Sequence, residues 1–350
     1  MSQLTVCSIV HGRLTAFIRW INPDADKKEN NAFQASLVRK YVSQNASQES
    51  ITIISTPDAG SDAKDSGLRR HYRGHAAVDG YDIDIVFIIS PEDAYGKPLE
   101  ELLSIFDGLV RKSYPNSTIE ITNSSIKLIL SNELAFDVVP MLATDKPDEQ
   151  IIVKKDGSRV HTSVQKHNDF VKKRTRLSKE VPGRVCFNEC LRAMKWWKEF
   201  QADQSYYLSW DEETGKDNRP PSALIDWLAA YAFDKLNVEK TYAETLAKWY
   251  GYLAHVVRNQ LPVFFEDYYT APFLTGQAGW IVLDPVNPAN NITAKWDRNK
   301  LSEFAGWFEK ARDSWSRIIR YDIDGEDNLS LEELVKLFGN PFKNHCDKED

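Results

Sequence analysis

The chain has 350 residues, of which 42% are hydrophobic and 27% are charged, and this balance excludes an intrinsically disordered protein. Its formal net charge of −7 excludes a protein that coats nucleic acid through a broadly basic surface. We find neither a long apolar run nor a cleavable N-terminal leader, so we expect a cytoplasmic protein without a membrane span or signal peptide, large enough for two lobes.

The N-terminal part of the chain mixes helices with short strands. Helical periodicity predicts helices at residues 12–20 and 31–45. The segments that follow are short, rich in β-branched residues and separated by turn signals such as Asn123-Ser124. They are predicted to be strands at residues 51–55, 83–89, 118–122, 125–130 and 134–139.

After about residue 160 the strand signals nearly vanish, and helical periodicity replaces them. The predicted helices cover residues 183–201, 221–235, 240–260 and 298–318. We therefore expect an α+β protein. Residues 1–155 are predicted to form a lobe with a mixed sheet and N-terminal helices, and residues 156–350 a helical lobe.

Two acidic residues occupy alternate positions of one predicted strand. Asp82 and Asp84 flank Ile83, and the apolar run continues to Ile89. Because side chains alternate between the faces of a strand, Asp82 and Asp84 are expected on one face and Ile83 and Ile85 on the other. Neighbouring carboxylates repel each other unless a cation neutralises them, and Mg²⁺ prefers such oxygen ligands. The spacing alone fits either a metal site or a solvated strand edge.

A third acid, Asp137, interrupts the apolar strand at residues 134–139. An acid in a buried strand needs a partner, which a metal site shared with Asp82 and Asp84 would supply. Three carboxylates on neighbouring strands suit two Mg²⁺ ions about 3.5–4 Å apart, which activate a hydroxyl and hold a triphosphate. The alternative for Asp137 is a turn cap.

The same Asp-Ile-Asp tripeptide recurs at Asp322 to Asp324, near the C-terminus. The acids from Asp322 to Glu333 imitate a calcium-binding EF-hand loop, but Asp327 stands where that loop needs glycine. We interpret the segment as an acidic loop before a helix that starts near Ser330, with Ser330 and Glu333 forming a capping box. A calcium-responsive helical protein is the alternative.

A Gly-Ser after a strand, two alternating aspartates and a later single aspartate resemble the polymerase-β-like nucleotidyltransferases. Within that superfamily, the chain most resembles the cGAS/DncV-like nucleotidyltransferases (CD-NTases) of bacterial CBASS anti-phage defence, which are relatives of the oligoadenylate synthases. The likeness extends over most of the chain. Its motifs are Gly60-Ser61 followed by Ser66, Arg192 to Trp197, Pro221 to Asp226, Leu283-Asp284-Pro285-Val286-Asn287-Pro288-Ala289-Asn290-Asn291 and Leu337-Phe338-Gly339-Asn340-Pro341-Phe342.

The resemblance implies a synthase that makes a cyclic di- or oligonucleotide second messenger from nucleoside triphosphates, ATP among them. It implies that Asp82, Asp84 and Asp137 are the catalytic residues and bind two Mg²⁺ ions, or Mn²⁺ in their place. A downstream effector would receive the product, and an accessory activating protein is a further expected partner. Neither a membrane nor a strong nucleic-acid surface is expected.

The resemblance also implies a set of residues that bind the nucleotide. They are Gly60, Ser61, Arg73, Lys195 and Ser222. The structural alternatives are a surface helix lysine for Lys195 and a helix N-cap for Ser222. The Gly-Ser loop also has an alternative register, in which Arg73-Gly74-His75-Ala76 precedes the acidic strand.

Two other functions use the same fold. One is a linear nucleotidyltransferase that makes 2′–5′ oligonucleotides or modifies tRNA or protein. The other is a catalytically silent nucleotide-binding protein. The sequence has no long stripe of Lys and Arg of the kind that tRNA would need, and the presence of all three acids counts against a silent protein.

Overall fold

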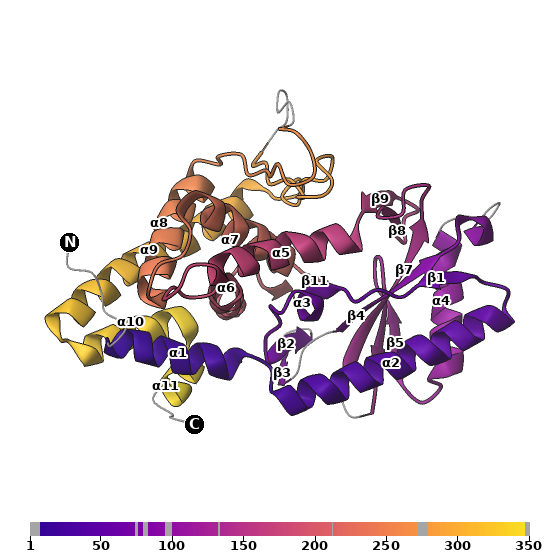
Figure 1. Cartoon of the computed structure of the whole chain (residues 1–350), viewed down its shortest axis with the longest axis horizontal. Helices are drawn as coiled ribbons and strands as arrows, with labels where there is room; N and C mark the ends of the chain where they lie inside the picture. Colours follow the sequence, from indigo (N-terminus) through magenta and orange to yellow (C-terminus); the bar gives the residue numbers. More distant parts are fainter. Residues whose placement is uncertain are drawn as a thin grey trace. The chain divides into compact units, whose positions relative to one another are not determined.

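The computed structural model describes residues 8–73, 76–79, 83–94, 100–131, 134–211, 213–271 and 279–346, without the side chains of residues 70–73, 76–79, 94 and 100. The chain forms two compact units (Figure 1). The sheet unit contains residues 23–71 and 79–170, and the helical unit contains residues 1–22, 72–78 and 171–350. The predicted α+β class, with a mixed sheet followed by helices, is confirmed.

The sheet unit is built on a sheet with seven strands among the described residues. They are β1 (Ile53–Ser55), β4 (Ile83–Ile89), β5 (Thr118–Ile121), β6 (Ile126–Ile129), β7 (Ala135–Ala143), β8 (Gln150–Val153) and β9 (Arg159–Thr162). The order is β1-β4-β7-β6-β5, and β8 pairs with both β7 and β9. β4 and β7 run parallel, whereas the other described pairs in this sheet are antiparallel. Helices α2 (Ala25–Gln48) and α4 (Glu100–Ser113), the short α3 (Gly60–Ala63) and the 3-10 turn Pro91–Ala94 complete the unit.

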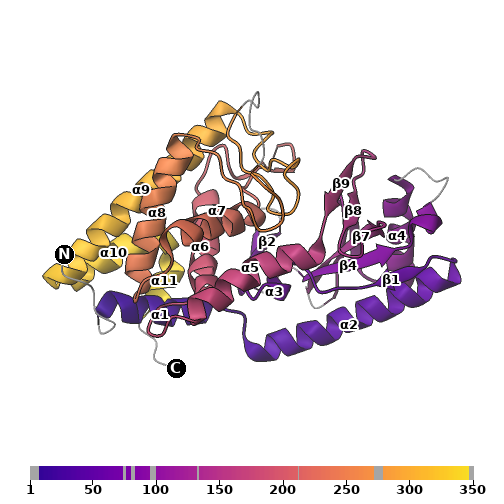
Figure 2. The same ribbon diagram turned by 45° about the horizontal axis from the view of Figure 1, so that its top comes forward.

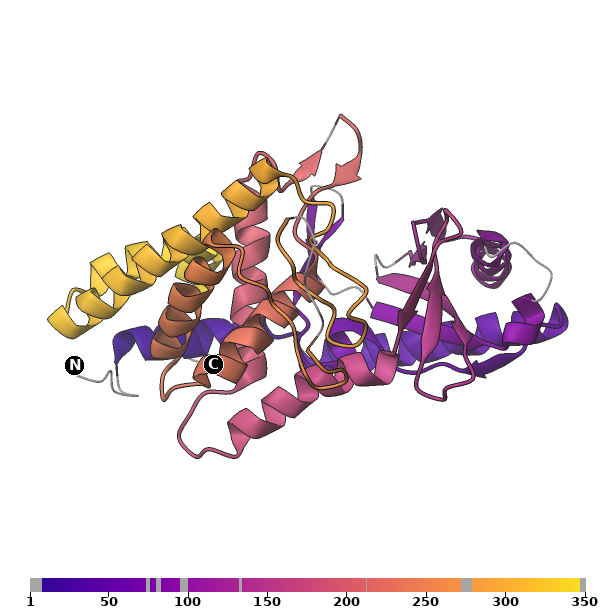
Figure 3. The same ribbon diagram turned by 90° about the horizontal axis from the view of Figure 1, so that it is seen from above.

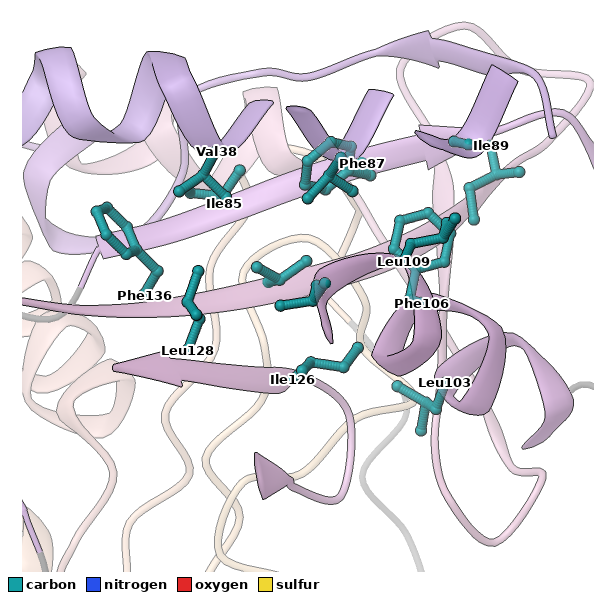
Figure 4. Close-up of a cluster of buried hydrophobic side chains, with 14 of the residues drawn as sticks. Val38, Ile85, Phe87, Ile89, Leu103, Phe106, Leu109, Ile126, Leu128 and Phe136 are labelled. Carbon is teal, nitrogen blue, oxygen red and sulfur yellow. The ribbon is translucent and has the colours of Figure 1, made fainter. Parts of the chain in front are cut away.

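The two central strands divide their side chains between two faces. Ile85 of β4 and Phe136 of β7 are fully buried in one core with apolar residues of α2 and α4 (Figure 4). The alternate positions carry Asp84, Val86 and Asp137 to the opposite face, where Val86 belongs to a smaller cluster. The predicted alternation of Asp84 with its isoleucine neighbours is therefore confirmed, because the apolar positions are committed to the core.

Helix α2 is longer than predicted and buries a narrow stripe. Val38 and Val42 are fully buried against the sheet, with Ala35 and Ala46 on the same side. Phe33, an aromatic residue near the start of the same helix, is 58% exposed. The reason is helix geometry, since a residue two positions from Ala35 points to the other side of the helix.

The helical unit consists mainly of helices from both ends of the chain (Figures 2 and 3). They are α1 (Ile9–Ile21), α6 (Phe187–Ala202), α7 (Ser222–Leu236), α8 (Tyr242–Arg258), α9 (Arg298–Asp324), α10 (Asp327–Phe338) and α11 (Asn340–His345). Helix α5 (Val164–Lys179) begins in the sheet unit and ends in this one. Two small hairpins pair β2 (Arg70–Arg73) with β3 (Ala76–Asp79) and β10 (Trp210–Asp211) with β11 (Lys216–Asp217). No described helix is both long and apolar enough to cross a membrane.

Helix α1 packs with the C-terminal helices. Leu14 and Phe17 are fully buried, and the ring of Phe17 contacts those of Trp196, Phe338 and Phe342. The sequence-based division placed this segment with the N-terminal lobe. Its apolar face is instead covered by rings from α6, α10 and α11, so aromatic packing joins the first described helix to the last ones.

The glycine that separates α10 from α11 is required by packing. Gly339 has φ 79°, and a Cβ atom on it would lie 2.7 Å from Cε2 of Phe200. The flanking Phe338 and Phe342 are fully buried. The Phe-Gly motif at the end of the chain therefore has a structural role in closing the core of the helical unit.

The acidic segment near the C-terminus is helical, so the expected loop and capping box are both wrong. Helix α9 continues to Asp324, Gly325 ends it in the left-handed conformation, and α10 begins at Asp327. The Ser330 hydroxyl donates a hydrogen bond to the carbonyl oxygen of Asp327, 2.9 Å away, from within the helix. Because Asp322 is also helical, these acids do not form a calcium-binding loop.

Glu333 of this segment joins α10 to α9. Its carboxylate lies 2.9 Å from Nη2 of Arg317 and 2.7 Å from Nζ of Lys336, and its side chain is 7% exposed. Burial raises the pKa of Glu333, but hydrogen bonds from Arg317 and Lys336 outweigh it, and the pKa is lowered overall.

We predict that Glu333→Gln reduces the free energy of unfolding by about 1–2 kcal/mol, because the two cations lose their shared carboxylate. A lowered folded pKa means that this stabilisation is present above the unfolded value, about 4.3, and is lost as the pH falls through the folded value. Denaturant unfolding of both proteins at pH 7 and pH 3 measures the difference. Calcium should leave the unfolding midpoint unchanged, and a calcium-dependent rise abolished by Glu333→Gln would contradict the helical assignment.

Candidate active site

Two of the predicted acids lie directly opposite each other. Asp84 of β4 pairs with Asp137 of β7 in the parallel register, and both are half-buried. Neighbouring strands are about 4.8 Å apart, and side chains at paired positions point to the same face. Two carboxylates in this arrangement fit a hard divalent cation as the shared neutralising partner.

The third predicted acid, Asp82, lies outside the described residues. Within the described ranges, no group of three or more His, Cys, Asp or Glu side chains forms a metal cluster. The pair of Asp84 and Asp137 is thus the described part of the predicted metal site, and its oxygen donors suit Mg²⁺ or Mn²⁺.

The turn before β6 orients Asp137. The hydroxyl of the buried Ser125 donates a hydrogen bond to Oδ1 of Asp137, 3.1 Å away. Oγ1 of Thr122 lies 2.8 Å from Oγ of Ser125. Lys127 of β6 is the cross-strand neighbour of Asp137. Sequence reasoning missed Ser125, although its position directly after a predicted turn and two residues from Lys127 placed it at the start of a strand.

Helix α3 brings the Gly-Ser motif against Asp84. Gly60 has φ 73°, and a Cβ atom on it would lie 1.7 Å from Oδ2 of Asp84, a distance that no side chain allows. The N–H of Ser66 donates to the carbonyl oxygen of Ser61, 2.9 Å away, and closes the loop. This contact with Asp84 supports the Gly60-Ser61 register.

The alternative register falls on a segment that is described only in part. Gly74 and His75 lie outside the described residues, and Arg73 belongs to β2 without a described side chain. The role predicted for Arg73 in nucleotide binding therefore stays a prediction.

The segment that leads into Gly60 is held from two sides. Nδ2 of the buried Asn168 donates to the carbonyl oxygen of Asp58, 2.8 Å away. Nη2 of Arg39 lies 2.7 Å from Oδ1 of Asp58, and an isolated bridge pairs Asp58 with Ile85. These contacts fix the chain two residues before Gly60, and no sequence motif pointed to the distant Asn168.

The helical unit holds the predicted lysine and serine. Lys195 of α6 is buried, and its Nζ lies 2.7 Å from Oδ1 of Asp226, with both side chains 4% exposed. The surface alternative for Lys195 is therefore wrong. Nζ of Lys198, one helical turn later, donates to Oγ of Ser222 over 3.3 Å. Lys198, which sequence reasoning missed, is thus the lysine hydrogen-bonded to Ser222.

Ser222 is the first residue of α7 and is exposed. Pro221 occupies the N-cap position, so the N-cap alternative for Ser222 is wrong. The first amide groups of a helix lack partners within the helix and attract anions. An exposed hydroxyl beside Lys198 at this helix start has the chemistry of a phosphate contact.

The Asp-Pro-x-Asn-Pro-x-Asn-Asn motif folds a loop. Oδ1 of Asp284 accepts the N–H of Val286 over 2.8 Å, and Nδ2 of Asn290 donates to Oδ2 of Asp284 over 3.1 Å. Nδ2 of Asn291 donates to the carbonyl oxygen of Trp280, also over 3.1 Å. The side chains of this motif therefore form hydrogen bonds that hold the loop itself together.

Comparison with known proteins gives relatives along most of the chain. The cyclic AMP-AMP-AMP synthase of Escherichia coli (strain MS 115-1) is 26% identical over 282 residues, which cover 77% of this chain and 80% of that protein. The solved structure of E. coli MS115-1 CdnC with ATP covers 95% of this chain and 98% of that chain, with a TM-score of 0.75 and 23% identity. The CdnC:HORMA-deltaN complex of the same strain has the same coverage, with a TM-score of 0.74 and 24% identity. No protein-family profile matches the chain.

The two lysines of α6 are predicted to differ in their effect on stability. Lys195→Met should reduce the free energy of unfolding by about 3–5 kcal/mol, because it leaves Asp226 charged and buried without its cation. Lys198→Met should cost less, about 1–3 kcal/mol, because its acidic partner Glu199 also lies 4.0 Å from Arg219 and keeps that cation. Denaturant unfolding of both variants measures the difference.

The double variant Lys195→Met/Asp226→Leu is the control. It replaces the buried pair with apolar side chains and should recover most of the stability lost in the single variant. Equal losses for Lys195→Met and Lys198→Met would contradict the structural role assigned to the pair of Lys195 and Asp226.

Proposed function

Because the chain belongs to the cGAS/DncV-like nucleotidyltransferases, we propose that it makes a cyclic di- or oligonucleotide second messenger from nucleoside triphosphates in anti-phage signalling. The observation that carries this proposal is the register of β4 and β7, which brings Asp84 opposite Asp137 beside the Gly-Ser loop. The E. coli relative that is a cyclic AMP-AMP-AMP synthase supports cyclisation and ATP as a substrate.

The proposed catalytic residues are Asp82, Asp84 and Asp137. Bound there, two Mg²⁺ ions, or Mn²⁺ in their place, would activate the attacking ribose hydroxyl and neutralise the charge of the leaving pyrophosphate. Ser125 orients the carboxylate of Asp137 through its hydrogen bond to Oδ1. Because Gly60 has no side chain, Oδ2 of Asp84 can lie directly against its backbone.

Phosphate contacts are proposed in each unit. Backbone amides of Gly60 and Ser61 would bind the β- and γ-phosphates, with the serine hydroxyl assisting and Arg73 as a further cation. In the helical unit, Lys198 and Ser222 would donate to phosphate oxygens.

Lys195 is proposed to act indirectly. Its ion pair with Asp226 joins α6 to α7, and this contact supports the positions of Lys198 and Ser222. The division of labour between residues 1–155, as the catalytic lobe, and residues 156–350, as the lobe that completes the nucleotide pocket, remains part of this proposal.

The partners are proposed by the same reasoning. The CdnC chain of the CdnC:HORMA-deltaN complex matches 95% of this chain, which supports an accessory protein as a partner, and we propose that this partner activates the enzyme. The cyclic product would act on a downstream effector.

We predict that Asp84→Asn and Asp137→Asn each lower product formation more than about 100-fold, because each removes a charge that offsets the metal ions. The assay incubates purified protein with four labelled nucleoside triphosphates and Mg²⁺ or Mn²⁺, followed by phosphatase. A phosphatase-resistant product indicates cyclisation. Asp145→Asn, an exposed site beyond β7, is the matched control and should leave activity unchanged.

The same assay separates the alternatives. Phosphatase-sensitive oligomers would indicate the linear nucleotidyltransferase. Absence of product with either metal, in the presence of candidate activators, would indicate the silent nucleotide-binding protein. Unchanged activity in both aspartate variants would contradict the assignment of Asp84 and Asp137 as catalytic residues.

Gly60→Ala is predicted to lower activity about 100-fold, because the new Cβ atom forces the carboxylate of Asp84 from its position. Gly183→Ala is the matched control, since Gly183 has φ 74° with no atom within 4 Å of the added Cβ. Both variants should lose about 1 kcal/mol of stability to backbone strain. Comparable activity of the two variants would contradict the proposed contact of Gly60 with Asp84.

A further inference from the structure

One carboxylate holds both cations near the start of α7. Oε1 of Glu199 forms an ion pair with Nζ of Lys198, and Oε2 lies 4.0 Å from Nη1 of Arg219. The three side chains are 14%, 4% and 12% exposed, respectively. Because so little of each group meets solvent, water screens these charges less than on an open surface.

A second acid holds Arg219 on its other side. Nη2 of Arg219 lies 2.7 Å from Oδ2 of Asp217, and Nε donates to Oδ1 over 2.8 Å. Burial raises the pKa of Asp217, but the hydrogen bond and charge of Arg219 outweigh it, and the pKa is lowered overall. Both acids therefore oppose the attraction of Lys198 and Arg219 for an anion.

Arg219 also lies close in sequence to the proposed phosphate contact. Only Pro220 and Pro221 separate it from Ser222, whose hydroxyl accepts the hydrogen bond of Lys198. The geometry therefore collects one exposed hydroxyl, one ammonium and one guanidinium around the start of α7, with Glu199 shared by the two cations.

We infer that Glu199 is a positioning residue that holds Lys198 and Arg219 in place and, as their counter-charge, limits their affinity for polyphosphate so that pyrophosphate is released. This inference rests on the proposed function. Nucleotidyl transfer forms a bond from the ribose oxygen to the α-phosphorus and breaks the bond from that phosphorus to the β-bridging oxygen. The hydroxyl proton goes to solvent, and pyrophosphate leaves.

The need for such a counter-charge follows from the charges of substrate and product. ATP and pyrophosphate both present β- and γ-derived phosphate oxygens to the same cations. Tighter binding of that shared part would lower KM without raising kcat, and it would slow product release. Glu199 competes with these oxygens for the donors of Lys198 and Arg219 in every turnover.

The variant that tests this is Glu199→Gln, which keeps the shape and removes the charge. It should bind pyrophosphate and ATP on the order of 3- to 30-fold more tightly. This range corresponds to the removal of one unit of repulsive charge at contact distance, partly screened by solvent. Titration calorimetry in EDTA measures both affinities without divalent ions. In the metal-supplemented assay, KM for ATP and kcat should both fall, and pyrophosphate should inhibit more strongly. Glu199→Asp, which keeps the charge, should stay close to the natural protein.

Glu239→Gln is the matched control for the charge change. Glu239 also pairs with a lysine of the helical unit, Lys248, at 2.5 Å, and its removal should leave the pyrophosphate affinity unchanged. Should Glu199→Gln fail to fold, Asp217→Asn decides instead. Its carboxylate is 46% exposed, and its removal should tighten pyrophosphate binding about 2- to 5-fold.

The outcomes separate this inference from the proposed function. If the natural protein binds ATP and Lys198→Met weakens that binding, the nucleotide site stands; equal or weaker pyrophosphate binding by Glu199→Gln then overturns the role of Glu199 alone. If the natural protein binds neither ATP nor pyrophosphate in EDTA, the proposed phosphate contact at Lys198 and Ser222 fails, and the role of Glu199 fails with it.

Discussion

The parallel pairing of β4 with β7 places the carboxylates of Asp84 and Asp137 side by side on one face of the sheet, and the arrangement of the sheet unit follows from it. A slip of one residue in either strand would turn its carboxylate into the core and expose its apolar neighbours. Ile85 and Phe136 prevent that slip, because they are fully buried with residues of α2 and α4. The core therefore fixes the position of two like charges whose oxygens suit a divalent cation.

The groups around this pair restrict where the carboxylates point. Ser125 donates to Asp137 from one side, and the backbone of Gly60 lies against Asp84 from another. Asn168 and Arg39 in turn hold Asp58, which leads into Gly60. Such supporting contacts decide whether a metal ligand is held accurately enough to act. In this view, the family's Gly-Ser motif has a steric role at its glycine in addition to any phosphate contact.

The sequence predicted the parts of this fold that depend on local alternation. Strand β4 has the predicted bounds because its apolar residues alternate with Asp84 and continue to Ile89. Strands β8 and β9 were missed, since each has only four residues and β9 carries Arg159 and His161. Helix α5 was missed because most of its residues are polar or charged. Even one of its buried residues is an arginine, Arg174.

The candidate site was predicted to the level of residue type and helix face. Lys195 and Lys198 lie three residues apart, so the sequence places both on one side of α6. Only the packing against α7 shows that Lys195 meets Asp226 and Lys198 meets Ser222. Ser125 and Glu199 were missed for the same reason, because their importance comes from a partner that is a contact in space and not a spacing in sequence.

The two units arrange their charged side chains differently: the sheet unit places acids side by side, and the helical unit pairs lysines with acids. This difference affects how a nucleotide would be bound. The sheet unit places two acids opposite each other in the β4–β7 register, which suits a divalent cation. The helical unit pairs its buried lysines with acids, Lys195 with Asp226 and Lys198 with Glu199. A polyphosphate there must compete with a carboxylate already in place, which lowers affinity while it keeps the cations positioned. An enzyme that releases pyrophosphate at every bond it makes is better served by that balance than by uncompensated cations, since tight product binding would limit its turnover.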